Sequence, residues 1–517
     1  MTNSRVHKSL TNIKVGLFFY LLSLFLAFFS RKIFLDNLGS EFIGLVGTLN
    51  SILGFLNIAE LGIGSSVCFF LYKPIEQKDK KVINDILSIL GFIYHRIGFF
   101  ILIAGVLCSL FFPIIFKHSI DLKIVYFSFY SFLLSSVSGY FINYLQIFLS
   151  ADQRNYVVSI YTQTISIVKT GIQIFLAYYY KNLYLWVGIE LFFGIISYIL
   201  INRRIRKEYI WLKTNASRGK ALVGRYPEII LKTKQIFIQK IKDFILTKSD
   251  EIFVFSFISL QMVAYYGNYM LILNKIIYLV NVFFNGMGTG VGNLVAENNS
   301  KNTSKVFWEL TALRFFITGF VVFGLLLFMQ PFIFCWLGTK YFLNDIILYL
   351  LLINLFIMFS RGVVEMYIHA YGLYADVWAS WVEVIVNITL TLTMAKFFGL
   401  VGILYGKILS VAGIALLWKP YYLFKAGLKQ PYINYWKGMF SYYLIFVLFI
   451  VLIIPIRFFI IDIKVHNFLT LALYILYIIP PLMIFYFLVL YQFTKGMKYF
   501  VDRVPLLSKI LKNRNRR

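Results

Sequence analysis

The chain has 517 residues, of which 60% are hydrophobic and 14% are charged, and its formal net charge is +28. A soluble globular protein carries about 25% charged residues, and long apolar runs recur here from one end to the other, so composition excludes a soluble fold and predicts an all-α polytopic membrane protein. The positive charge lies in loops between apolar runs and not in a basic domain, which excludes nucleic acid as a partner and leaves membrane lipids.

A membrane-spanning helix needs about 20 mostly apolar residues, and we predict about fourteen such helices. Their ranges are 14–36, 42–72, 84–116, 120–149, 156–179, 183–202, 233–258, 262–294, 305–334, 342–370, 374–397, 400–423, 437–461 and 467–493. The seventh range is the most polar, because Lys240 and Asp250 lie among its apolar residues. Only a helix that faces protein or water accepts such residues.

The loops between these ranges differ in charge. With the N-terminus in the cytoplasm, the inner loops and tails hold 32 basic residues and the outer loops hold 9. Basic residues concentrate on the cytoplasmic side of membrane proteins. The pattern therefore predicts that both termini are cytoplasmic and that the number of spans is even.

A basic segment near the middle divides the chain into two halves that resemble each other. Residues 39–53 align with residues 259–273, with Gly47 opposite Gly267. This repeat predicts two pseudo-symmetric six-helix lobes with a path between them. The expected division is an N-terminal lobe (1–202), a basic cytoplasmic linker (203–232), a C-terminal lobe (233–424), two appended helices (425–493) and a basic cytoplasmic tail (494–517).

Two short motifs resemble those of known transporters. The first runs from Arg31-Lys32-Ile33-Phe34 through Leu38-Gly39 and Gly44 to Asn57-Ile-Ala-Glu60-Leu61-Gly62-Ile63-Gly64. The second is Lys248-Ser249-Asp250-Glu251-Ile252, followed by Val263-Ala-Tyr265-Tyr266-Gly267-Asn268-Tyr269. Both resemble polysaccharide flippases, the O-antigen or lipid-linked oligosaccharide transporters of the multidrug/oligosaccharidyl-lipid/polysaccharide (MOP) exporter superfamily.

The resemblance implies a function as well as a fold. Such flippases move undecaprenyl-pyrophosphate-linked oligosaccharide across the bacterial cytoplasmic (inner) membrane by alternating access, for polysaccharide export. The implied protein is not an enzyme and needs no cofactor, although Na⁺ or H⁺ can drive such transport. Glycan polymerases or ligases are its expected partner proteins.

Charged side chains within the predicted spans are the candidate site residues, because a charge at a helix centre costs roughly 2.5–3.5 kcal/mol. Five cations are candidates for binding the pyrophosphate: Arg31, Lys275, Arg361, Lys169 and Lys407. Gly362 leaves room for a ligand beside Arg361. The alternative is structural pairing, since Arg361 and Glu365 lie one helical turn apart, and Glu309 and Arg314 are close in sequence.

Two carboxylates, Glu60 and Asp250, are candidates for coupling to an ion, because a lone carboxylate in a membrane can take a proton or Na⁺. The alternative is a capped or paired structural carboxylate near Gly62 and Gly64. The three cysteines and five histidines are scattered, and their spacing does not predict a metal site. The glycine run 286–292 predicts close helix packing or a flexible gate.

The sequence leaves three other functions open. A multidrug or cation antiporter of the same fold would favour acidic cavity residues. A membrane glycan polymerase, ligase or glycosyltransferase would carry a long outer loop with catalytic residues, whereas the predicted outer loops are short. A channel would not require two matched lobes.

Overall fold

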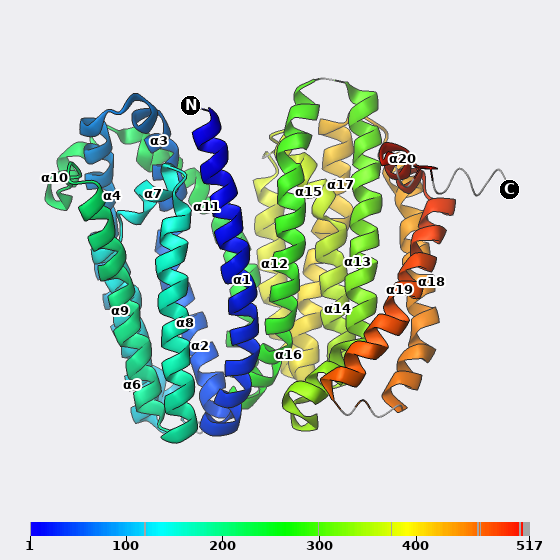
Figure 1. The fold of residues 1–517 in the computed structure, drawn as a ribbon, viewed down its shortest axis with the longest axis horizontal. Helices are drawn as coiled ribbons and strands as arrows, with labels where there is room; N and C mark the ends of the chain where they lie inside the picture. Colours follow the sequence, from blue (N-terminus) through cyan, green and yellow to red (C-terminus); the bar gives the residue numbers. More distant parts are fainter. Residues whose placement is uncertain are drawn as a thin grey trace. The chain divides into compact units, whose positions relative to one another are not determined.

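The computed structural model describes residues 2–117, 120–297, 299–373, 375–462, 465, 467–505 and 508–509. Within these ranges every regular element is a helix (Figure 1). The chain forms two compact units, residues 1–267 (unit 1) and 268–517 (unit 2). The division therefore falls inside helix α12, whereas the lobe boundaries at 202/203 and 232/233 remain predictions from sequence.

Unit 1 contains the first eleven α-helices and the start of the twelfth. They are α1 (Thr2–Leu38), α2 (Ser40–Leu56), η1 (Asn57–Glu60), α3 (Ile63–Gln77), α4 (Lys80–Ser109), α5 (Phe112–Ile115), α6 (Leu122–Ile142), α7 (Gln146–Ala151), α8 (Asn155–Tyr179), α9 (Leu183–Glu208), α10 (Ala216–Val223), α11 (Pro227–Phe257) and α12 (Leu260–Ala296).

Side-chain caps fix where several of these helices begin. The Asp79 carboxylate accepts from two backbone N–H groups at the start of α4, and the Asn182 side chain does the same for α9. Gly62, with φ 93°, lies between η1 and α3. This left-handed conformation favours glycine, and it turns the chain so that η1 and α3 do not form one continuous helix.

The core of unit 1 is built from neighbouring helices packed side by side. α4 packs on α6 and α10, α9 packs on α6 and α8, and α1 packs on α8. α11 packs against α2 and α3. Exposed side chains on the flanks include large apolar ones such as Phe25 and Phe99, as expected where lipid is the solvent.

Unit 2 contains the rest of α12 and the remaining helices. They are α13 (Ser300–Leu337), η2 (Thr339–Tyr341), α14 (Asp345–Ser360), α15 (Gly362–Ala370), α16 (Val377–Ala412), η3 (Gly413–Trp418), α17 (Lys419–Tyr422), η4 (Leu423–Gly427), α18 (Ile433–Asp462), α19 (Phe468–Phe493) and α20 (Lys495–Arg503).

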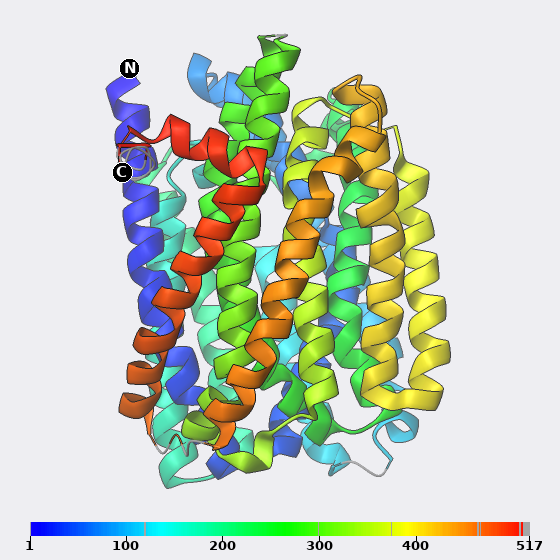
Figure 2. The ribbon, with the colours of Figure 1, turned by 90° about the vertical axis from the view of Figure 1, so that its right-hand side faces the viewer.

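Helix α13 is the centre of unit 2. It packs against α14, α18, α19 and α20, and most of its side chains in the apolar stretch are buried. Figure 2 shows α18 and α19 beside it, and α20 turning across its end. Glycines permit these approaches: a Cβ at Gly319 would lie 2.3 Å from the Tyr486 ring of α19, and one at Gly438 of α18 would lie 2.2 Å from the Trp308 ring.

Eleven segments of the described chain are long and apolar enough to cross a membrane. One of them, Trp378–Gly427, has 50 residues and contains a kink at Gly399 (φ 55°), so it has the length of the eleventh and twelfth predicted spans together. The fifth and seventh predicted spans are the helices α8 and α11, which are not among the eleven. The expected all-α polytopic membrane fold is confirmed.

The two segments that resemble each other in sequence meet within unit 1. A Cβ at Gly44 of α2 would lie 1.8 Å from the backbone carbonyl oxygen of Leu260, at the start of α12. Gly47, one turn further on, lies against Val263. The glycines of the first copy therefore let α2 and α12 approach closely at their backbones.

The glycine run in α12 has a different environment. Cβ atoms built at Gly286, Gly288, Gly290 and Gly292 would meet no described atom within 4 Å. Close helix packing at this run is therefore not seen within unit 2, and the alternative of a flexible gate stays a prediction.

Candidate functional site

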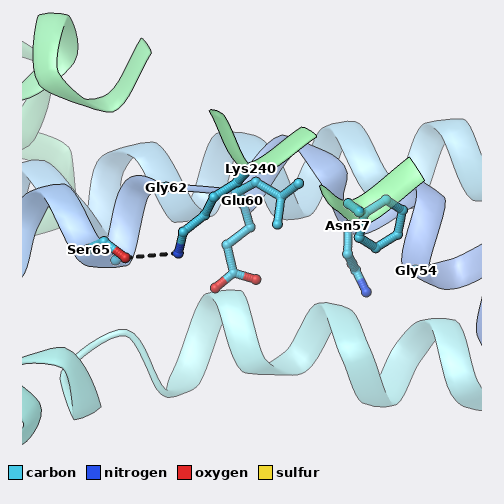
Figure 3. Close-up of a pocket in the computed structure, with 9 residues that line it drawn as sticks. Gly54, Asn57, Glu60, Gly62, Ser65 and Lys240 are labelled. Carbon is cyan, nitrogen blue, oxygen red and sulfur yellow. Dashed lines mark hydrogen bonds between the residues drawn. The ribbon is translucent and has the colours of Figure 1, made fainter. Parts of the chain in front are cut away.

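A cavity of about 290 Å³ lies in unit 1 between η1, the start of α3, and α11 (Figure 3). Its lining residues are Gly54, Asn57, Glu60, Leu61, Gly62, Gly64, Ser65, Lys240 and Phe244. The left-handed turn at Gly62 is part of the wall, and a Cβ there would lie 3.0 Å from the backbone nitrogen of Phe237. The glycine thus allows α11 to close over η1.

Glu60 is held in this cavity by two neighbouring helices. The Tyr94 hydroxyl of α4 donates to Glu60 Oε1 at 2.9 Å, and the Tyr140 hydroxyl of α6 donates to Oε2 at 2.8 Å. Tyr140 also lies 3.1 Å from Asn57 Oδ1, which accepts from Ser136 as well. Both carboxylate oxygens are therefore held by neutral donors.

Lys240 approaches the same cavity from α11. Its Nζ donates to Ser65 Oγ at 3.0 Å, and Figure 3 shows its side chain passing beside Glu60 toward Ser65. The cavity thus combines a carboxylate, an ammonium group, an amide and a hydroxyl. Such a set can exchange a proton at Glu60 or bind a small polar ligand. No cluster of three or more His, Cys, Asp or Glu side chains with metal-binding geometry occurs in the described part of the chain.

Asp250, the second predicted coupling residue, does not line this cavity. It is buried in α11, where the Tyr266 hydroxyl donates to its Oδ2 at 3.0 Å. The next residue, Glu251, accepts from Ser51 Oγ at 2.6 Å. The structure therefore places Glu60 and Asp250 in separate hydrogen-bonded surroundings.

Arg31 joins α1 to the beginning of α12. Its Nη2 donates to the Ala264 carbonyl at 3.0 Å, and a Cβ at Gly267 would lie 3.1 Å from the same nitrogen. Gly267 is the residue that aligns with Gly47 in the sequence repeat. Its lack of a side chain leaves space for the Arg31 guanidinium. Lys275, two turns further along α12, is half-buried in unit 2.

Lys169 is ion-paired. Its Nζ lies 2.5 Å from Glu190 Oε1, and Gln173 Nε2 donates to the other oxygen of Glu190 at 2.9 Å. The pair joins α8 to α9. This ion pair supports the alternative that Lys169 has a structural role and does not bind pyrophosphate.

Arg361 lies at the break between α14 and α15 and also pairs with acids. Its Nε is 3.1 Å from Glu365, and its Nη1 is 3.6 Å from the buried Glu383 of α16. The spacing of Arg361 and Glu365 had indicated the first of these pairs, but nothing in the local sequence indicated Glu383.

The expected room beside Gly362 is filled by another cation. A Cβ at Gly362 would lie 2.7 Å from Nη2 of Arg314, so the guanidinium occupies that space. Arg314 Nε donates to the Phe359 carbonyl at 2.9 Å, and the guanidinium carbon lies 4.2 Å from the Phe284 ring centroid. The expectation that Gly362 leaves space for a ligand is therefore wrong, because the glycine admits a protein side chain.

Lys407 is half-buried in α16, and its backbone carbonyl accepts from Ser410 Oγ at 2.8 Å. The same hydroxyl accepts from Asn387 Nδ2 at 3.0 Å. Lys407 does not line the cavity at Glu60. The cations chosen from sequence are therefore distributed over several helices of both units.

Sequence reasoning missed the tyrosines. Tyr94 and Tyr140 supply both hydrogen bonds to Glu60, but they belong to helices rich in aromatic residues, where two particular tyrosines do not stand out. Their rings also contact each other, with centroids 5.6 Å apart. Only the packing of α4 on α6 reveals that both hydroxyls point to the same carboxylate.

No family model and no curated protein matches the chain. Among solved structures it is similar to the lipid II flippase MurJ in an inward closed conformation, with a TM-score of 0.60 and 15% identity over 93% of this chain and 99% of that chain. It is also similar to a multidrug resistance MATE family transporter of the MOP superfamily in an inward-facing conformation, with a TM-score of 0.53 and 15% identity over 78% of this chain and 95% of that chain. The chain therefore shares its overall fold with these two transporters.

Proposed function

We propose that this protein is a flippase that moves undecaprenyl-pyrophosphate-linked oligosaccharide across the bacterial cytoplasmic membrane by alternating access, for polysaccharide export. It acts without catalytic chemistry of its own. In this proposal the membrane is the inner membrane, both termini are cytoplasmic, and glycan polymerases or ligases are the partner proteins.

One observation supports the proposal most directly. It is the share of this chain whose fold is similar to that of the lipid II flippase MurJ. The similarity to MurJ extends over 93% of this chain, whereas the similarity to the multidrug transporter extends over 78%. About a fifth of this chain thus has no counterpart in the multidrug transporter. The sequence motifs around Arg31 and Glu60 support the same choice, because they resemble polysaccharide flippases.

The charged residues have different roles in this proposal. Arg31 and Lys275 contact the pyrophosphate, because both are cations within predicted spans and a guanidinium can hold two phosphate oxygens. Lys169, Arg361 and Lys407 are secondary candidates, the first two being ion-paired here. Glu60 is the coupling site for a proton or Na⁺, with Asp250 as the second candidate.

Transport can be measured in liposomes that contain the purified protein and undecaprenyl-pyrophosphate-linked oligosaccharide. Periodate added outside oxidises the sugars of the outer leaflet only. In protein-free vesicles about half of the glycan should react, whereas wild-type protein should expose the remainder with time. A protein that leaves the glycan in place but moves a cationic dye would instead be the multidrug antiporter of the same fold.

Arg31→Gln tests the pyrophosphate contact. We expect transport to be lost while membrane insertion is retained, and Arg31→Lys, which keeps the charge, should retain part of the activity. Arg361 requires a different design, because its removal leaves Glu383 buried without this cation. The double variant Arg361→Gln/Glu383→Gln removes both charges, and loss of transport in it would assign Arg361 to the cargo. Full glycan export by both the Arg31→Gln and the double variant would contradict the assignment.

A further inference from the structure

The segment between α9 and α11 is held firmly on α4. The Asn84 side chain accepts from the Lys213 backbone N–H at 2.8 Å and donates to the Trp211 carbonyl at 3.3 Å. One turn further along α4, Ser88 Oγ accepts from the Asn215 backbone N–H at 3.0 Å. The basic segment that precedes α11 is therefore an ordered part of unit 1, and its side chains have fixed positions on the surface.

Helix α10 docks on α4 through a glycine. A Cβ at Gly219 would lie 2.4 Å from the Ser88 carbonyl oxygen and 2.5 Å from Phe92 Cβ, so only glycine fits this approach. Arg218 and Lys220, on either side of Gly219, are both exposed. Figure 1 shows α10 beside α4. With Gly219 packed against α4, the Arg218 and Lys220 side chains lie exposed on the surface of unit 1.

Arg96 of α4 lies over the ring of Phe92, the residue whose Cβ atom Gly219 of α10 approaches. Its guanidinium carbon is 4.8 Å from the Phe92 ring centroid, and the side chain is exposed. None of the ion pairs between described residues involves Arg96. A guanidinium stacked on a ring is held in place while its N–H groups remain able to take two phosphate oxygens.

The exposure pattern of α4 and α5 gives the depth of Arg96. Exposed apolar side chains begin at Phe99 (59% exposed) and continue through Ile103 to Ile115. Arg96 comes one turn before this apolar band and one turn after Phe92, the residue that α10 approaches. It therefore lies at the edge of the hydrocarbon region, where phospholipid headgroups are found.

The chain around α10 has the composition of an interfacial segment. Residues 209–226 contain four basic residues, Lys213, Arg218, Lys220 and Arg225, and no acidic residue. Ile210, at the start of this segment, is 80% exposed. Basic side chains next to an exposed apolar one are typical of a surface that meets anionic lipid, whereas a site for a soluble anion has no need of the apolar side chain.

We propose that Arg96, Arg218 and Lys220 form a binding site for the phosphate of an anionic phospholipid headgroup. The lipid's acyl chains lie along the apolar band that begins at Phe99. The bound lipid joins α4 to α10 and so stabilises the ordered conformation of the segment before α11. The proposal does not depend on which cargo the transporter carries.

Thermal unfolding of the purified full-length chain in detergent tests this site. The probes are phosphatidylglycerol, phosphatidylcholine and inorganic phosphate, and the variants are Arg96→Gln and Arg218→Gln/Lys220→Gln. Lys123→Gln is the matched control, because Lys123 is exposed at the start of α6, at the opposite end of the α4–α6 pair. We expect phosphatidylglycerol to raise the Tm of the wild type and of the control, and to raise the Tm of both site variants by less than half as much.

A second measurement is needed if Arg96→Gln fails to fold. Native mass spectrometry of Arg218→Gln/Lys220→Gln serves this purpose, because both substituted side chains are exposed. Fewer bound phosphatidylglycerol molecules than on the wild type would support the site. An equal phosphatidylglycerol effect on the wild type and all variants would overturn the proposal. An equal rise in Tm with inorganic phosphate alone would also overturn it, because the site would then recognise a free anion.

Discussion

The half-buried Glu60 of unit 1 and the buried Glu309 of unit 2 are held by different kinds of donor. In unit 1, Glu60 accepts from the hydroxyls of Tyr94 and Tyr140, at 2.9 and 2.8 Å. In unit 2, the buried Glu309 of α13 lies 2.8 Å from Nε of Arg503 in α20. A second arginine of unit 2, the fully buried Arg457 of α18, contacts Asp345 and Tyr349 of α14, each at 2.5 Å.

This difference distinguishes a carboxylate that can change its protonation state, Glu60, from carboxylates that serve a structural role in ion pairs. A tyrosine hydroxyl can donate to a carboxylate, and it can also accept from a protonated carboxyl group, so the surroundings of Glu60 remain satisfied when the charge changes. An arginine has no such freedom, and removing its partner leaves a buried charge. We therefore expect unit 2 to lose stability when its pairs are broken, and Glu60 to tolerate neutralisation.

The pair between Asp345 and Arg457 should give the largest effect. Arg457 is 2% exposed and Asp345 is 46% exposed, so Asp345→Asn leaves the buried member without its counter-ion. Breaking a fully buried pair costs about 3–5 kcal/mol, and because Asp345 is half-exposed we expect a loss at the lower end of that range, about 3 kcal/mol. The free energy of unfolding in detergent measures the loss. Asp36→Asn, the same change at an exposed carboxylate of α1, should cost less than about 0.5 kcal/mol, and similar losses in both variants would remove the contrast between the units.

The pair between Arg503 and Glu309 should give the next largest effect. Arg503→Gln leaves the buried Glu309 without its cation, and an unsatisfied buried charged group costs about 2 kcal/mol or more. Because α20 also buries Met497 and Val501 against unit 2, we expect the helix to stay in place. The double variant Arg503→Gln/Glu309→Gln should recover most of the stability in a double-mutant cycle. If it does not, the ion pair is not what holds the two side chains.

The hydroxyl of Tyr140 should contribute less. Tyr140→Phe removes one hydrogen bond to Glu60 and leaves the ring in contact with Tyr94. Such a bond contributes about 1 kcal/mol to stability, which the same unfolding measurement detects. Tyr94→Phe is the matched partner, since it removes the bond to the other oxygen. A loss from either change as large as that from Asp345→Asn would make the Glu60 site a structural one.

Neutralising Glu60 should have the smallest effect on stability. A Glu60→Gln side chain keeps the shape and can still bond both hydroxyls, so we expect a change below about 0.5 kcal/mol. Glycan transport should nevertheless fall at least about tenfold, which corresponds to about 1.4 kcal/mol in the barrier, if Glu60 couples transport to an ion. Wild-type transport by this variant in liposomes would remove Glu60 from the mechanism.

The fold class could be predicted because hydrophobic runs of membrane-spanning length are visible in the sequence. Local pairing was also predictable where both partners lie one turn apart along the chain, as with Arg361 and Glu365. Closeness in sequence did not identify the partners of Glu309 and Arg314, because Arg314 donates to the Phe359 carbonyl and Glu309 contacts Arg503. These partners come from different helices, and periodicity within one helix carries no information about them.

Composition and periodicity by themselves determined that this chain is an all-helical membrane protein, because each helix in lipid must satisfy its own backbone and must be apolar over a fixed length. Tertiary structure alone decided which charges are held by neutral groups and which by opposite charges, as at Glu60 and Arg457. The physical reason is that a side chain's partners are set by which helices pack together, and in this chain those helices are often more than a hundred residues apart.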